Sequence, residues 1–95
     1  MISDFEAFKN TIESFNAGTL KSDKKEVRKI LKSKSAHKLT TKLLILNYRI
    51  EFLEKENELF NKYSEETEEF KKEFDRLETK ARACGEILEI LEENE

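Results

Sequence analysis

The chain contains one histidine and one cysteine, His37 and Cys84, the residue types most often used as catalytic base and nucleophile. A catalytic Cys–His pair needs the thiol and the imidazole within hydrogen-bond reach of each other. No motif brings the two together, because they lie 47 positions apart in different predicted elements. Cys84 occupies a regularly apolar position, where a cysteine usually serves as a small buried hydrophobe. A single cysteine also cannot form an internal disulfide, so we predict no chemical role for either residue.

Carboxylates are the other abundant reactive groups, with 21 Asp and Glu in 95 residues. A catalytic acid needs a pKa raised by burial or by a like-charged neighbour, and most of these acids fall on the polar sides of the predicted helices. The sequence has no Cys/His spacing typical of zinc sites and no phosphate, dinucleotide or calcium loop. We therefore predict that the protein is not an enzyme and uses no metal, cofactor or small-molecule substrate.

One stretch could bind a charged ligand. Residues 21–42 carry nine Lys or Arg and two acids, a net charge of +7. Such a cluster can contact phosphates without reading sequence, but no aromatic residue between Phe15 and Tyr48 is available to stack on bases. Two interpretations stay open: a solvated face that pairs with the acidic half of the chain, which we favour, or a nucleic-acid-binding patch. The basic residues are Lys21, Lys24, Lys25, Arg28, Lys29, Lys32, Lys34, Lys38 and Lys42.

The charge is unevenly distributed along the chain. Residues 1–50 carry 11 Lys or Arg and 5 Asp or Glu, whereas residues 51–95 carry 7 and 16, so the halves have net charges of +6 and −9. The total of −3 hides this asymmetry. Opposite charges on the two halves can attract two copies of the chain to each other or bring one half to a polyanion.

The composition predicts helices and no sheet. The chain has no Pro and only two Gly, the residues on which the turns between strands depend, and it is rich in the helix formers Leu, Glu and Lys. Hydrophobic residues make up 37%, below the roughly 45–50% of ordinary domains, which favours an elongated or oligomeric protein. Neither an apolar run of about 20 residues nor a signal peptide is present, so we expect no membrane span and a cytoplasmic location.

Two short helices are predicted in the first third of the chain. Ser3 and Glu6 form a capping box, and apolar residues then recur every three or four positions. Gly18 suits a left-handed C-cap, so the first helix is predicted over residues 3–17. Ser22 can cap a second helix that runs to about Lys32.

A heptad-patterned helix is predicted from about Lys38 onward. Its first seam runs from Leu39 to Phe60 and is apolar on much of the helix circumference. A second, narrower seam then continues to the end of the chain with alternating steps of three and four. It contains Phe60, Tyr63, Thr67, Phe70, Phe74, Leu77, Ala81, Cys84, Leu88 and Leu91.

The two seams join at Phe60, where one residue of the heptad repeat is missing. The missing residue is typical of a stammer in a continuous coiled coil. It also fits a turn over residues 61–64, with Ser64 capping a new helix. No Gly, Pro or Asp marks such a turn, so we favour the continuous helix and keep the turn as the alternative.

These patterns predict a single all-α domain over residues 1–95. Short N-terminal helices pack on the long helix within residues 1–60, and residues 61–95 form a coiled-coil segment for oligomerisation. A break at 61–64 would instead give a four-helix bundle. We expect a small regulatory or adaptor protein that binds itself, as a homodimer or larger oligomer, or another helical protein; nucleic acid is the alternative partner. The predicted interface is formed by Phe60, Tyr63, Phe70, Phe74, Leu77, Ala81, Cys84, Leu88 and Leu91.

Overall fold

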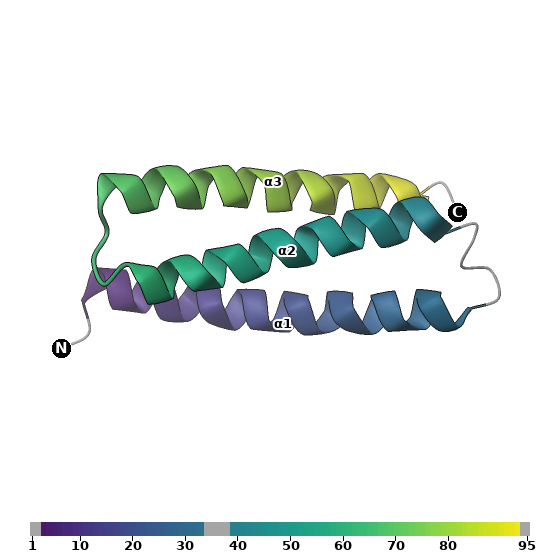
Figure 1. Ribbon diagram of the computed structural model, residues 1–95, viewed down its shortest axis with the longest axis horizontal. Coiled ribbons are helices and arrows are strands. Elements are labelled where there is room, and N and C mark those ends of the chain that lie inside the picture. Colours follow the sequence, from purple (N-terminus) through teal and green to yellow (C-terminus); the bar gives the residue numbers. More distant parts are fainter. Residues whose placement is uncertain (1–2, 34–38, 94–95) are drawn as a thin grey trace.

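The computed structural model describes residues 3–33 and 39–93, which form three helices and no strand. Helix α1 spans Asp4–Lys32, α2 spans Thr40–Lys62 and α3 spans Glu68–Glu93. They run alongside one another in an elongated bundle of 51 × 20 × 20 Å, with successive helices antiparallel (Figure 1). The all-α prediction is confirmed for these residues. None of the three helices is both long and apolar enough to cross a membrane.

The N-terminal third forms one helix, so the prediction of two short helices is wrong. The predicted start is correct, since Oγ of Ser3 accepts a hydrogen bond of 3.2 Å from the backbone N–H of Glu6. The predicted C-cap is absent: Gly18 lies within α1 and has no positive φ. Ser22 likewise lies inside the helix rather than capping a new one.

A continuous buried stripe explains why α1 does not break. Asn16, Leu20, Asp23 and Ile30 are all buried, and their spacing keeps them on one helical face. Asn16 and Asp23 are polar, so the sequence loses its apolar periodicity there although the buried stripe continues. Their burial is supported by polar partners on α2, described below.

The two glycines differ in the space available for a Cβ atom. Gly18→Ala is expected to raise the free energy of unfolding by about 0.5–1 kcal/mol, because Gly costs roughly this much relative to Ala inside a helix and a Cβ there would meet no atom within 4 Å. In Gly85→Ala the new Cβ would lie 3.3 Å from Nη1 of Arg49, so the gain is expected to be smaller. Urea unfolding of both variants measures the difference. Equal gains would contradict the close packing of Arg49 on Gly85.

The chain turns between α2 and α3, so the prediction of a continuous long helix is wrong and the alternative of a break is correct. The backbone N–H of Tyr63 donates to the carbonyl of Leu59 at 2.9 Å and ends α2. Thr67, not Ser64, caps α3, because its Oγ1 accepts a 3.1 Å hydrogen bond from the N–H of Phe70. With the first two predicted helices merged into α1, the four-helix alternative becomes a bundle of three.

Helix α2 lies at the centre of the packing and contacts both α1 and α3. Three buried clusters follow one another along the bundle, and each draws on α2 and α3. The first joins residues on both sides of the turn, so the core continues across residue 60. The clusters are Leu59, Phe60, Phe70, Phe74 and Leu77; then Leu20, Leu53 and Ala81; then Ile30, Leu46 and Leu88.

Candidate functional site

The predicted interface residues lie mostly in the core of the same chain. Seven of the nine are buried, and Tyr63 and Leu91 are partly exposed. The seam packs on α2 because the turn at residues 63–67 folds α3 back against it. The buried residues are Phe60, Phe70, Phe74, Leu77, Ala81, Cys84 and Leu88. These side chains are therefore not a free surface in the folded chain.

An aromatic cluster closes one end of the bundle and ties all three helices together. The ring of Phe70 on α3 lies 5.2 Å from that of Phe5 on α1 and 5.3 Å from that of Phe60 on α2. Phe8 on α1 lies 5.5 Å from Phe74 on α3. Tilted and edge-on arrangements such as these add to the stabilisation that burial provides. This end therefore holds α1 and α3 together through side chains alone.

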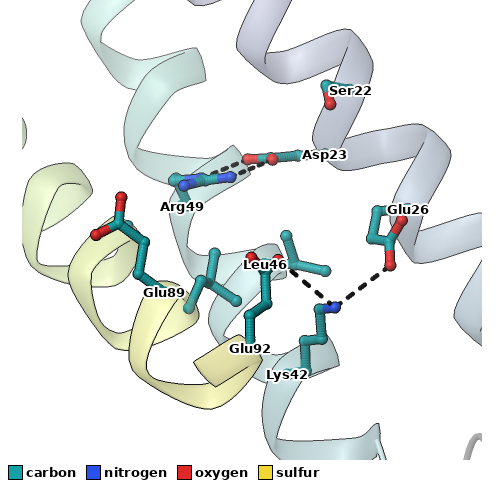
Figure 2. Close-up of a pocket in the computed structure, with 10 residues that line it drawn as sticks. Ser22, Asp23, Glu26, Lys42, Leu46, Arg49, Glu89 and Glu92 are labelled. Carbon is teal, nitrogen blue, oxygen red and sulfur yellow. Dashed lines mark hydrogen bonds and ion pairs between the residues drawn. The ribbon is translucent and has the colours of Figure 1, made fainter. Parts of the chain in front are cut away.

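A buried ion pair joins α1 to α2 in the middle of the bundle. Asp23 is 3% exposed, and the guanidinium of Arg49 donates two hydrogen bonds to its carboxylate, one of 2.6 Å from Nε to Oδ2 (Figure 2). The hydrogen bond to Asp23 raises the pKa of Arg49. A planar, two-bond contact of this kind fixes the relative position of two helices more strictly than a point charge would.

A second polar group lies two turns further along α2. Glu56 is fully buried, and its Oε2 accepts a 2.8 Å hydrogen bond from Nδ2 of Asn16 on α1. Its Oε1 accepts no hydrogen bond from the described residues. Burial, and then the neighbouring Glu78 on α3, raise the pKa of Glu56 to about 8, against the opposing effect of the Asn16 hydrogen bond. A carboxyl group with this pKa is mostly protonated at neutral pH.

A groove separates α1 from α3 over much of their length. Within the described ranges, no Cα atom of α1 lies within 8 Å of one in α3. Two hollows of about 280 and 270 Å³ lie between them and share Arg49, Gly85 and Glu89. We call this groove and its two rims the open face. Its lining includes Phe15, Thr19, Ser22 and Glu26 on α1, Lys42 and Arg49 on α2, and Glu78, Arg82, Gly85, Glu86, Glu89 and Glu92 on α3.

Charged side chains line the open face toward the C-terminal ends of α1 and α3. Lys42 rises from α2 between the two walls, with Nζ 3.5 Å from Glu26 on α1 and 3.8 Å from Glu92 on α3 (Figure 2). The two hollows are slightly smaller than typical small-molecule sites of roughly 300–1,000 Å³ and open to solvent.

The predicted basic stretch is only partly paired. Lys24 lies 3.0 Å from Glu54, and Lys42 bridges two acids as described. Lys34 and Lys38 fall outside the described residues, and so does His37. The remaining five side chains are exposed and form no ion pair with any described residue. They are Lys21, Lys25, Arg28, Lys29 and Lys32.

Of the two reactive residues that the sequence singled out, Cys84 lies among the described residues and His37 lies outside them. Cys84 is a buried free thiol, and burial raises its pKa, which disfavours the reactive thiolate. Across residues 3–33 and 39–93, no group of three or more His, Cys, Asp or Glu side chains could hold a metal ion. The described residues can fix helix positions and present charges.

Sequence reasoning missed the four polar residues that organise the centre of the bundle. Four polar side chains lie on or beside the buried faces of α1 and α2, where apolar side chains are usual. They are Asn16, Asp23, Arg49 and Glu56. A signal was available, because polar residues that fall on a heptad core position often fix register at some cost in stability. The distance between α1 and α3, by contrast, produces no recognisable pattern in the sequence of either helix.

Comparison with known proteins gives no relative on which to base a function. No family model matches the chain, and no curated protein and no solved structure is significantly similar to it.

Proposed function

We propose that the protein is a non-catalytic interaction module that associates with helices, its own or those of another protein, through the open face. The observation that carries this proposal is the separation of α1 from α3, because among the described residues no Cα atoms of the two helices lie within 8 Å and two hollows lie between them. The seam predicted from the sequence already packs on α2 of the same chain, so a partner must bind another surface. A single buried thiol suits the reducing cytoplasm, which we include in the proposal.

Exposed aromatic residues on α1 support the same assignment. Phe15 lines the open face and is 64% exposed, and Phe8, two helical turns earlier on the same side, is 39% exposed. Large aromatic side chains of this kind are enriched at protein interfaces. Tyr48 on α2 and Ile87 on α3 are also exposed, on the other flank of these helices, which does not line the two hollows of the open face.

A single tryptophan can report whether the open face is covered. The chain has no Trp, so Phe15→Trp places one indole on the open face. We expect its fluorescence to shift to shorter wavelength as the chain concentration rises from micromolar to millimolar, because association removes the ring from water. Light scattering of the same samples should show the mass rising above that of one chain.

The matched control is Tyr48→Trp, which places the indole on an exposed position of the other flank. Its emission should stay constant over the same concentrations. A constant emission from Phe15→Trp, with a mass of one chain throughout, would remove self-association as the function. A shift in Tyr48→Trp alone would move the interface to the other flank.

Polyanion binding is a second candidate, favoured by the five unpaired cations along the last three turns of α1. Lys21 and Arg28 lie beside a hollow between α1 and α2, away from the open face. Contacts with phosphates would release counterions, so binding should weaken steeply as salt rises.

Retention on double-stranded DNA at low salt tests this candidate. We expect Lys21→Glu/Arg28→Glu to weaken binding at least about tenfold, because two phosphate contacts become repulsive. Lys71→Glu/Lys72→Glu, the same charge change on α3, should bind as the wild type does. Absence of retention by the wild type at low salt would end the candidacy.

A further inference from the structure

Rows of opposite charge flank the open face on its two rims without meeting. On the α1 rim, Lys25 and Lys29 follow the groove-lining residues Ser22 and Glu26 by one turn, and Lys32 continues the row. On the α3 rim, Glu86 and Glu89 line the groove and Glu93 continues the row. All six side chains are exposed, and none forms an ion pair with a described residue. The groove keeps the two rows apart within one chain.

The acidic row carries a further cost in the isolated chain. The last turn of α3 contains acids and no basic residue, and negative charge at a helix C-terminus opposes the helix dipole. The basic row lies at the C-terminus of α1, where the dipole favours it. The α3 rim therefore gains most from cations that come from outside the chain.

The rows also lie at matching heights along the bundle. One core layer joins Leu20 on α1 to Ala81 on α3, and a later layer joins Ile30 to Leu88. Residues at the same height thus differ by about 58 to 61 positions between the two helices. Lys25, Lys29 and Lys32 correspond within this range to Glu86, Glu89 and Glu93.

We propose that a second copy of this chain covers the open face, with α1 of each copy lying parallel on α3 of the other. This inference rests on the proposed function and names its partner. A two-fold axis parallel to the bundle produces the arrangement, because it places α1 on the partner's α3 and preserves height along the helices. Each dimer then forms the Lys row–Glu row contact twice, as a two-fold interface requires.

The antiparallel alternative fits less well. A two-fold axis across the bundle would lay α1 on the partner's α1 and reverse the heights. The basic row would then face the N-terminal end of α1, where Phe8 and Phe15 are exposed and Asp4 is the nearest acid on that side. The acidic row of α3 would likewise face the N-terminal end of the partner's α3.

The size of the open face is sufficient for a stable dimer. The bundle is 51 Å long and 20 Å wide, so one side exceeds the roughly 800 Å² that each partner contributes to a standard interface. The exposed ring of Phe15 supplies apolar area near the middle. The charge rows then select the parallel arrangement, since electrostatic complementarity mainly determines which surfaces pair.

Charge reversal tests the arrangement of helices directly. The first variant reverses the charges of the α1 rim, and the second reverses the charges of the α3 rim. Light scattering measures the mass of each variant alone, of the two mixed in equal amounts, and of a single chain that carries both sets of substitutions. A third variant reverses three cations on the other flank of α1 as a matched control. The sets are Lys25→Glu/Lys29→Glu/Lys32→Glu, Glu86→Lys/Glu89→Lys/Glu93→Lys and Lys21→Glu/Lys24→Glu/Arg28→Glu.

We expect the wild type and the control to have the mass of two chains. Each rim variant alone should dissociate, with a dissociation constant at least about 100-fold higher, because both contacts become repulsive. The equal mixture should return to two chains, since each α1 then meets a partner α3 of opposite charge, and the chain carrying both sets should also dimerise. Helix content by circular dichroism confirms that each variant is folded.

The contradicting outcomes separate this inference from the proposed function. A dimeric wild type whose rim variants still dimerise, or whose mixture stays monomeric, overturns the parallel α1–α3 arrangement. If Phe15→Trp still shifts with concentration in that case, the open face remains the interaction surface. A wild type of one-chain mass at millimolar concentration, with no shift from Phe15→Trp, overturns this inference and removes self-association from the proposed function.

Discussion

Phe70→Ala is expected to lower the free energy of unfolding by about 3–5 kcal/mol, the usual cost of removing a buried Phe side chain. Phe70 is 1% exposed, and its ring lies within 5.2 to 5.9 Å of the rings of Phe5, Phe60, Phe74 and Tyr63. No single neighbour can fill the space that the ring leaves. Native domains are stable by about 5–15 kcal/mol, so this loss is a large part of the total.

Urea unfolding followed by circular dichroism measures the effect, and Phe15→Ala is the matched control. Phe15 is 64% exposed, so at low chain concentration, where self-association contributes little, the control should change stability by less than about 0.5 kcal/mol. Equal effects of the two substitutions would contradict the placement of Phe70 at the junction of the three helices. A loss confined to Phe70→Ala supports the aromatic cluster as the contact that holds α1 to α3.

The periodic apolar seam from Phe60 to Leu91 explains how much of the fold the sequence predicts. Spacing alone places Phe70, Leu77 and Leu88 on one face of a helix, and each is buried in the structure. A buried face needs a neighbour, but the spacing does not identify it. The same stripe fits a second copy, another protein or the chain's own α2, and only the turn at residues 63–67 decides among them.

That turn was hard to assign because its signals conflict. The heptad step at Phe60 fits both a stammer and a turn. The acids around Thr67 suit the first turn of a new helix whether Ser64 or Thr67 caps it. The deciding contribution is tertiary. When α3 folds back, Phe60, Phe70 and Phe74 form one cluster. In a continuous helix the same side chains would be spread along its length.

The N-terminal prediction failed for a different reason. Asn16 and Asp23 occupy core positions of α1, and their polarity made the helix look interrupted around Gly18 and Ser22. Polar groups can be buried only where partners satisfy them. Those partners, Glu56 and Arg49, lie more than 20 residues away on α2, outside the reach of any local pattern.

The open face could not be predicted at all from either helix alone. Its existence depends on the distance between α1 and α3, which follows from how each packs on α2. The charge asymmetry of the two halves of the chain did indicate that oppositely charged surfaces would be present. The structure refines this to two rows of charged residues at the same height on the two rims of the groove.

The stability of the protein is expected to fall as the pH rises between about 4.5 and about 8, because Glu56 is buried in its protonated form. Its pKa is raised from 4.5 to about 8 in the folded chain, so within this window the folded state keeps a proton that the unfolded state releases. The stabilisation from this group is complete below the unfolded value and is lost as the pH rises through the folded one. One proton gives a slope of about 1.4 kcal/mol per pH unit at its steepest.

Few other groups compete in this window. The chain has one histidine, and comparison between variants cancels any contribution that it makes. Glu78 and Asn16 are the polar neighbours of the Glu56 side chain. Above the folded pKa, a charged Glu56 would be buried next to Glu78, and its Oε1 would stay buried without a partner.

Glu56→Gln should remove this pH dependence while keeping the fold. A glutamine amide has nearly the shape of a protonated carboxyl group, can accept from Asn16 through its oxygen and can donate to Glu78 through its nitrogen. Urea unfolding at a series of pH values should therefore give a flatter profile than the wild type, with the variant more stable at the alkaline end. Glu58→Gln, an exposed neighbour on α2, should keep the wild-type slope. An unchanged slope in Glu56→Gln would show that the folded chain does not hold a proton at this position, and the carboxyl pair between α2 and α3 would then need another source of neutralisation.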